Sequence, residues 1–593
     1  MGILAELQRR RVFATGAIYI PASWAAAEIC LEIFDRFGAP AWAGDVIVVL
    51  FLLGFPVALL LSWLFDVTPD GVNRASPGTP LGIVALLGSG LFLSVGGYLS
   101  YQTFSGRLDE IRLVVLPLHT PAMNQEIQPY GAGVADHIRN ALRAIDPFKV
   151  TARTSSEAMA QAGLDIPAIA ARLGVQYVIE GSLEKLGSNL AVSISIIDDG
   201  GEELWSERFE REAADLFDLQ NDLVRAAALQ LGVEESNPQL RSQIRKPART
   251  TDPEAHRLLL SANYASWITD DNPEAGGKRL KLLKQARGRD PAYPDVYPAL
   301  AHHYAMQCWG MDNRLAPDCE MAVSYANQGI ELDPDLAEAY AVLAMIHSVR
   351  YEYEEAQAAL DRYFSLPDND IVSINIPFAY VNMARLQEAW DANIELYAND
   401  PLNPFAAGSL ANWAWGMKHD TELVDYYEQI QVELTGMSIL SGFPWMRMHR
   451  GIPLEQALAE AEAVASIWGE PEGFAKFYVV PSYDPSRIDE LSAELDEWYA
   501  RGDVRLSLLF GNQILFGDIE RAMDLAFETL EEGSFNPVPT WLRAPNMVQF
   551  RAHPRYMELM EAIGVTKHWD RYGWPPFCEQ RQGEWFCGLE FTL

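Results

Sequence analysis

The chain has 593 residues, of which 49% are hydrophobic and 21% are charged, and its formal net charge is -36. This length exceeds what one hydrophobic core supports, so several domains are expected, and the composition excludes a chain that is disordered throughout. The acidic balance disfavours nucleic-acid binding and adsorption to anionic lipid, because both need clustered lysine and arginine. It is typical of a solvated, self-repelling surface, and a cationic partner is the alternative.

Three apolar stretches come first in the chain. Leu81–Tyr101 contains no charged residue, and a helix of this length crosses a hydrocarbon core of about 30 Å. The stretch 12–33 contains Glu28 and Glu32. An ionisable residue inside a span usually faces protein or water, so Glu28 is expected to serve helix packing or the interface, with ion handling as the alternative. Residues 1–105 are therefore predicted to form a membrane domain with three transmembrane helices, at 12–33, 46–65 and 81–101.

Arg9, Arg10 and Arg11 determine the predicted topology. Clustered arginines before a first span remain in the cytoplasm, so three spans would place the chain from Gln102 onward outside it. If 12–33 only lies in the interface, two spans remain and the same rule places the body in the cytoplasm.

Four of the five cysteines form two close pairs, Cys308 with Cys319 and Cys578 with Cys587. Neither pair has the spacing of a zinc site, and the nearby His302 and His303 follow a helix-packing pattern, so no metal site is expected. The pairs predict two disulfides, which require an oxidising compartment and agree with a body outside the cytoplasm. Four free thiols are the alternative.

Residues 107–232 are predicted to form a small α/β domain, a mixed sheet with helices on one face. Val192, Ile194 and Ile196 alternate with Ser193 and Ser195, which indicates a half-buried strand. The predicted strands are 111–118, 148–152, 176–183, 189–197 and 203–209, and the predicted helices are 131–145, 166–173 and 216–231.

Gly131-Ala132-Gly133 follows a strand and precedes a helix, as in a dinucleotide-binding turn. The third glycine of that fingerprint is replaced by Asp136, and the preceding gap of 119–130 is longer than a tight phosphate-binding turn. The glycines therefore indicate a helix start, and no cofactor is expected.

The motifs VVLPL (114–118), TARTSSEAM (151–159) and LGVQYVIEGSLEKLGSNLAVSISIID (173–198), with ELWSERFER (203–211) and DLFDLQNDLV (215–224), carry a resemblance. They resemble the FlgO-like, TolB amino-terminal-type domain of bacterial membrane-anchored tetratricopeptide proteins. ELQRRRVF and GFPVALLLSWLFDVTPDG resemble the membrane region of the same proteins. The resemblance implies a non-catalytic periplasmic domain anchored in the bacterial inner membrane. In that family the domain is often fused to a nucleotide cyclase, a kinase or a winged-helix domain, and this chain is expected to lack such an output domain.

Residues 252–593 are predicted to form an all-α, tetratricopeptide-like superhelical array. Prolines recur at 33- to 43-residue spacings, near the 34-residue period of such repeats, and the longest spacing contains the loop between Cys308 and Cys319. The residues expected to pack the repeats are Pro334, Tyr340, Leu343, Ala344, Ala356, Leu360, Pro367 and Pro401. Aromatic residues become dense later, and they indicate either helix core or a ligand groove: Trp413, Trp415, Tyr426, Tyr427, Trp445, Tyr478 and Tyr483.

No catalytic motif stands out, so the chain is predicted not to be an enzyme. The leading hypothesis is a membrane-anchored scaffold whose array and α/β domain bind other membrane or periplasmic proteins and assemble an envelope complex. Its predicted partners are these proteins and the lipid bilayer, with a second copy of the chain also considered. The alternative is a sensory receptor subunit that relays a signal through the membrane to a separate effector.

Overall fold

The computed structural model describes most of the chain after residue 110 and two short strands before it. The described residues are 65–68, 71–74, 110–121, 127–212, 215–245, 249–269, 273–310, 314–366, 373–435, 438, 451–467, 470–533 and 546–590. The chain divides into two compact units, Met1–Glu110 and Ile111–Leu593. In the first unit, the described residues form an antiparallel hairpin of β1 (Phe65–Thr68) and β2 (Gly71–Arg74).

The membrane part of the predicted fold class needs correction. Among the described residues, no helix is long and apolar enough to cross a membrane. The longest of them, α10 (Pro253–Thr269) and α11 (Pro273–Arg289), have 17 residues each, which is about 26 Å against a core of about 30 Å. On this finding the predicted transmembrane class and inner-membrane location are wrong, and the described chain is mostly helical with a small mixed sheet.

Several predicted features of the membrane domain lie outside the described residues. Phe65, the predicted end of the second span, instead lies in β1, where it pairs with Arg74. The features outside the described residues are 12–33, 46–64, 81–101, Arg9, Arg10, Arg11, Glu28 and Glu32.

The second unit begins with a five-stranded mixed sheet in the order β4-β3-β5-β6-β7. Strand β3 runs parallel to β4 and β5, and β5, β6 and β7 form an antiparallel meander. Along β6, Val192, Ile194 and Ile196 are buried on one face, as the alternation predicted. The bounds are β3 (Ile111–Val115), β4 (Phe148–Val150), β5 (Tyr177–Leu186), β6 (Asn189–Asp198) and β7 (Glu203–Glu212).

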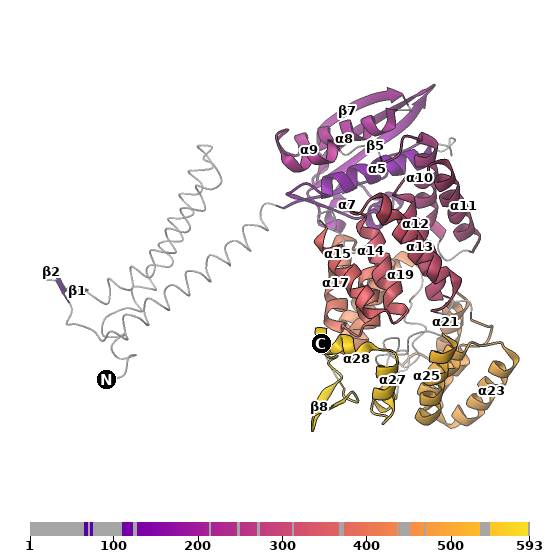
Figure 1. Cartoon of the computed structure of the whole chain (residues 1–593). Coiled ribbons are helices and arrows are strands. Elements are labelled where there is room, and N and C mark those ends of the chain that lie inside the picture. The colour runs from indigo at the N-terminus through magenta and orange to yellow at the C-terminus, as the bar shows by residue number, and fades with distance from the viewer. Residues whose placement is uncertain are drawn as a thin grey trace. The chain divides into compact units, whose positions relative to one another are not determined.

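Helices contact both faces of the sheet, whereas the sequence predicted one covered face. Helices α5 and α8 lie along the face that carries Val115 and Ile194 (Figure 1). On the other face, Val114 and Val178 pack with residues of α6 and α7. Helix α6 was not predicted, because its RTSSEAMAQ sequence has a weak apolar pattern. The bounds are α5 (Gln128–Arg143), α6 (Arg153–Gln161), α7 (Ile166–Leu173), α8 (Leu216–Gln230) and α9 (Pro238–Arg245).

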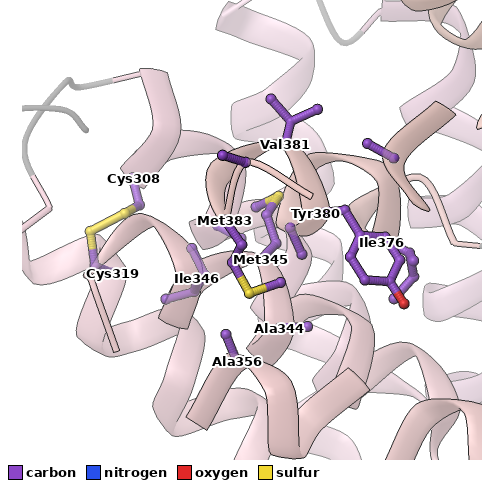
Figure 2. Packing of buried hydrophobic residues seen from close by; sticks show 14 of the residues in the cluster. Cys308, Cys319, Ala344, Met345, Ile346, Ala356, Ile376, Tyr380, Val381 and Met383 are labelled. Atoms are coloured by element: carbon purple, nitrogen blue, oxygen red, sulfur yellow. A yellow bond between two sulfur atoms is a disulfide. The ribbon is translucent and has the colours of Figure 1, made fainter. Parts of the chain in front are cut away.

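From Pro253 the chain forms antiparallel helix hairpins, which pair α10 with α11, α12 with α13, α14 with α15, α16 with α17 and α18 with α19. The first helices α12, α14 and α16 also contact one another in turn. Ala344 and Ala356 are fully buried between the helices (Figure 2). The bounds are α12 (Val296–Gly310), α13 (Pro317–Leu332), α14 (Ala337–Val349), α15 (Tyr353–Ser365), α16 (Asn375–Asn382), α17 (Leu386–Asn399), α18 (Pro404–Trp413), the π-helix η2 (Ala414–Lys418) and α19 (Thr421–Thr435).

The carboxyl-terminal part folds back onto the central hairpins. Trp569 Nε1 donates to the Met383 carbonyl at 2.9 Å, and Arg314 donates to the Leu530 carbonyl at 3.1 Å. One continuous apolar core therefore joins the first and last hairpins. The elements are α21 (Leu454–Ile467), α22 (Lys476–Tyr483), η4 (Pro485–Arg487), α23 (Ile488–Arg501), α24 (Leu506–Phe516), α25 (Ile519–Glu532), α26 (Met547–Arg551), α27 (Tyr556–Ala562), α28 (Val565–Tyr572), β8 (Glu579–Arg581) and β9 (Glu584–Phe586).

Candidate binding site

Three neighbouring helices bring four polar residues together, and we call this group the inner cluster: His302 on α12, Glu338 on α14, and Ser373 and Asn375 at the start of α16. Asn375 Nδ2 donates to Glu338 Oε1 at 2.9 Å, and Ser373 Oγ donates to the same oxygen at 3.0 Å. Asn375 Nδ2 also lies 3.4 Å from His302 Nδ1. The stacking of α12, α14 and α16 creates the group, since its members are 73 positions apart in sequence at the widest.

The inner cluster contains two hydrogen-bond acceptors that the chain itself does not use. Both donors reach Glu338 Oε1, and no described residue donates to Oε2. Asn375 has no exposed surface, and its Oδ1 has no hydrogen-bond partner among the described residues. A buried acceptor without a donor is costly. The exposed Glu338 carboxylate suits a ligand that brings N–H donors, such as an ammonium or a guanidinium.

Protein atoms around the Glu338 carboxylate disfavour its ionised form. Glu338 keeps exposed surface, yet desolvation raises its pKa to about 7, against the opposing effect of the hydrogen bonds from Ser373 and Asn375. Burial, with the positive charge of Arg279 and the neighbouring His303, lowers the pKa of His302 to about 4. At neutral pH the imidazole is therefore uncharged, while the carboxyl group is near its midpoint and responds to a ligand's charge.

A second polar cluster, which we call the junction, joins the α/β domain to the helix hairpins. Asp400, in the turn between α17 and α18, accepts from Ser155 N at 2.9 Å and from Ser155 Oγ at 2.6 Å. Its other oxygen accepts from Asn403 Nδ2 at 3.0 Å. The Ser155 hydroxyl also accepts from Leu402 N at 2.8 Å, and Ala152 N donates to the Asn399 carbonyl at 2.9 Å. Burial raises the pKa of Asp400, and the hydrogen bonds that its carboxylate accepts from Ser155 and Asn403 oppose that shift.

The four cysteines that the structure describes form two disulfides, Cys308 with Cys319 and Cys578 with Cys587. The first disulfide ties the end of α12, which carries His302, to α13 (Figure 2). Because Cys308 is used in this bond, it is not available as a thiolate ligand. Among the described residues, no group of three or more histidine, cysteine, aspartate or glutamate side chains is placed to hold a metal ion.

The predicted packing residues that the structure describes lie mainly in the hairpin core. Leu343, Ala344, Ala356 and Leu360 are buried, and Tyr340 is partly buried against the same core. The Pro334 carbonyl accepts from the Tyr340 hydroxyl at 3.1 Å. Pro401 lies in the turn of the junction, and Pro367 lies outside the described residues.

The aromatic residues also belong mainly to the core, which favours the interpretation as helix packing over a ligand groove. Trp413, Tyr427 and Tyr478 are buried, and Trp415 and Tyr483 pack against them. Tyr426 is exposed, and Trp445 lies outside the described residues.

The Gly131-Ala132-Gly133 motif lies within α5 and serves helix packing. A Cβ atom on Gly133 would clash with the Leu260 side chain on α10, so glycine lets these two helices approach. The segment therefore lacks the tight strand-to-helix turn that a phosphate site needs.

Sequence reasoning missed the chemistry of both clusters. The recurring prolines include Pro401, but nothing in the local pattern distinguished Asp400 before it, and Glu338 was not predicted as a site residue. One signal was available for Glu338, which is the only acidic residue in the mostly apolar helix AEAYAVLAMIHSV. Ser373 and Asn375 gave no signal, because their role depends on the stacking of separate hairpins.

No family model matches the chain. A protein of Rhizobium meliloti (strain 1021) named "Putative adenylate cyclase 3" is 26% identical over 249 residues. The match covers 42% of this chain and 42% of that protein, so the chain spans less than half the length of the curated relative. The relative's name is that of an enzyme, so this comparison does not support the prediction that the chain is not an enzyme.

Proposed function

We propose that the chain is a binding protein whose inner cluster holds a donor-bearing segment of a polypeptide partner. The observation that carries this proposal is the unused acceptor Glu338 Oε2 on an exposed carboxylate whose other oxygen is held by Ser373 and Asn375. A lysine or arginine side chain would supply donors to the exposed Glu338 carboxylate, which Asn375 holds in place through Nδ2.

The charge of the chain favours a basic partner. A net charge of -36 attracts cationic segments over long range and accelerates their encounter with the protein. The stacked hairpins add a repeat architecture in which neighbouring units form an extended binding surface. Together these features support a scaffold that recognises a cationic, extended segment.

The proposal is tested with an array of short extended peptides that differ only by lysine or norleucine at each position. The full chain should select lysine-containing peptides, and Glu338→Gln should weaken their binding about tenfold, since a charge-assisted hydrogen bond is lost. The matched control is Glu388→Gln, which changes a carboxylate that already pairs with Arg385 at 2.7 Å. Equal binding of both peptide sets by the full chain and the variant would refute the proposal.

The relative's name favours a second candidate, that the chain forms part of an adenylate cyclase or of its regulatory region. Cyclisation of ATP is phosphoryl-transfer chemistry and needs bound divalent cations. Incubation of the full chain with ATP and Mg²⁺ or Mn²⁺ tests this candidate by the appearance of cyclic AMP. Turnover that scales with enzyme concentration would favour it, whereas background rates at all concentrations would reject catalysis by this chain alone.

A further inference from the structure

Strand β7 is a long outer edge of the five-stranded sheet. It is last in the strand order, and its inner side pairs with β6. Within the described residues no strand pairs with its outer side. Trp205 and Phe209 are half-buried, and the other eight residues of the strand are exposed. An edge of this length presents unpaired backbone groups, which natural proteins usually protect or use for pairing with another chain.

The sequence of β7 is complementary to itself in one antiparallel register. In a two-fold pair centred on Phe209, this residue faces its own copy, Arg208 faces Glu210 of the second copy, and Glu207 faces Arg211. Two-fold symmetry repeats each ion pair, so four oppositely charged pairs form. Arg208 and Glu210 belong to one face and Glu207 and Arg211 to the other, as the pairing of β7 with β6 shows.

Neighbouring registers lack this complementarity. In an antiparallel pair, residues that lie opposite each other point to the same face of the sheet. A two-fold pair is therefore always centred on one residue, and the next possible registers are centred on the residues before and after it. Centring on Arg208 or on Glu210 places like charges opposite each other, and centring on Glu207 does the same. Like charges directly opposite are destabilising, whereas opposite charges and aromatic pairs stabilise. The charge pattern therefore selects Phe209 as the centre.

The existing contacts of these charges do not prevent the pairing. Arg208 lies 3.5 Å from Glu184 and Arg211 lies 2.7 Å from Asp222, and all four side chains are about one-third or more exposed. Exposed ion pairs contribute little to stability, so exchanging or sharing them costs little. The Glu210 carboxylate accepts from Asn189 Nδ2 at 2.8 Å through one oxygen, which leaves the other for Arg208 of the second copy. Arg211 also donates to the Glu210 carbonyl, a contact that must rearrange if that carbonyl joins the new ladder.

We propose that two copies of the chain associate through antiparallel pairing of β7 centred on Phe209, so that their sheets become continuous. The occupant of the edge is a second copy because the charges match only when the strand meets itself in this register. This proposal is independent of the inner cluster. A single strand pair is a small interface, so the dimer is weak and depends on ionic strength.

Sedimentation velocity of the full chain over a concentration series tests the proposal. A monomer–dimer equilibrium is expected at about 0.15 M salt, where screening limits the repulsion between two chains that each carry a net charge of -36. Arg208→Glu and Glu210→Arg should each weaken association roughly tenfold, because each replaces two attractive pairs with repulsive ones. The double variant Arg208→Glu/Glu210→Arg should restore the wild-type dissociation constant. Arg487→Glu, an equivalent charge reversal at an exposed position before α23, should leave it unchanged.

Thermal unfolding of each variant checks that the exposed substitutions leave the fold intact. A chain that stays monomeric up to about 1 mM at about 0.15 M salt would overturn the proposal. So would a dimer that ignores both single reversals, or single reversals that weaken it without rescue by the double variant. If Arg208→Glu fails to fold, Glu210→Arg and the double variant still decide between the outcomes.

Discussion

The junction and the inner cluster are both organised by a carboxylate, but the two carboxylates differ in how fully the chain satisfies them. Asp400 is 3% exposed, and both of its oxygens accept hydrogen bonds from Ser155 or Asn403. Glu338 is exposed, its donors share one oxygen, and Asn375 beside it keeps a buried acceptor without a partner.

This difference separates stability from binding. A buried carboxylate with complete hydrogen bonds holds two parts of the fold together, because its donors lose their partner if it is removed. An exposed carboxylate with a spare oxygen, such as Glu338, contributes little to holding the fold together and is available to a ligand. We therefore expect substitutions at the junction to change unfolding, and substitutions in the inner cluster to change binding.

The largest effect is expected from Asp400→Ala. It leaves Ser155 N, Ser155 Oγ and Asn403 Nδ2 without their acceptor inside the protein, which should reduce the free energy of unfolding by about 4 kcal/mol. Urea denaturation followed by tryptophan fluorescence measures this loss. Asp420→Ala, which removes only the capping contacts to Glu422 N and Leu423 N, serves as the control and should cost about 1 kcal/mol. Similar losses for both variants would show that Asp400 stabilises the fold no more than an ordinary helix cap does.

Next in size is the double variant Cys308→Ser/Cys319→Ser. The disulfide closes a loop with a sequence separation of 11, and its loss should reduce the free energy of unfolding by about 3 kcal/mol through the entropy of the unfolded chain. Denaturation of oxidised wild type, reduced wild type and the variant measures the effect. The variant, which keeps the Cys578–Cys587 disulfide, should be less stable than the oxidised wild type and at least as stable as the reduced wild type, which lacks both disulfides. A variant as stable as the oxidised wild type would contradict a stabilising role.

Asn375→Ala should weaken binding of lysine-containing peptides about tenfold and change the free energy of unfolding by less than about 1 kcal/mol. The stability change is small because the substitution removes a donor to Glu338 but also an unsatisfied buried oxygen. Calorimetric titration and urea denaturation give the two quantities. If stability fell as far as in Asp400→Ala while affinity stayed the same, Asn375 would be structural.

Binding should also depend on pH. With a pKa raised to about 7, Glu338 is mostly protonated at pH 6 and mostly ionised at pH 8, so a lysine peptide should bind several-fold more tightly at pH 8. Tyr363 interacts electrostatically with the same carboxylate, and His302 lies beside Asn375. Both stay neutral across this range, since the pKa of His302 is lowered to about 4 and that of Tyr363 is raised. Titrations at both pH values should show this difference in affinity for the wild-type chain and no difference for Glu338→Gln.

The raised pKa of Glu338 affects the stability of the fold in the opposite direction. The folded state holds the Glu338 proton up to about pH 7, whereas the unfolded chain releases it near pH 4.5. This residue therefore makes the folded state less stable as pH rises between those values. Glu338→Gln should remove that part of the pH dependence of the unfolding midpoint, and an unchanged profile would show that the carboxylate is not desolvated.

Arg172→Ala should have the smallest effect. Arg172 and Glu433 form an ion pair at 2.9 Å next to the junction, and both side chains are 45% exposed. Exposed pairs are screened and contribute about 0.5 kcal/mol or less. Urea denaturation at low and high salt measures this, and a loss comparable to that of Asp400→Ala would mean that surface charge, not the buried hydrogen bonds, holds the junction.

Local patterns predicted much of the described fold. The alternation in 189–197 identified β6, and the apolar spacing in 216–231 identified α8, because both elements bury one face of their own sequence. Helix α6 was missed, since its short polar sequence is held by contacts such as that of Ser155 with Asp400, 245 residues away. The inner cluster was missed for the same reason, because no local period reports which side chains of separate hairpins will meet.

A double-mutant cycle tests the central claim most directly. The dissociation constants of a lysine peptide and of its norleucine counterpart are measured by calorimetry at pH 8 on the wild-type chain and on Glu338→Gln. If the lysine binds at the inner cluster, the two changes are coupled by about 1 kcal/mol or more, because each removes the same charge-assisted contact. A coupling energy of zero, with both changes simply additive, would contradict the assignment of the inner cluster as the binding site.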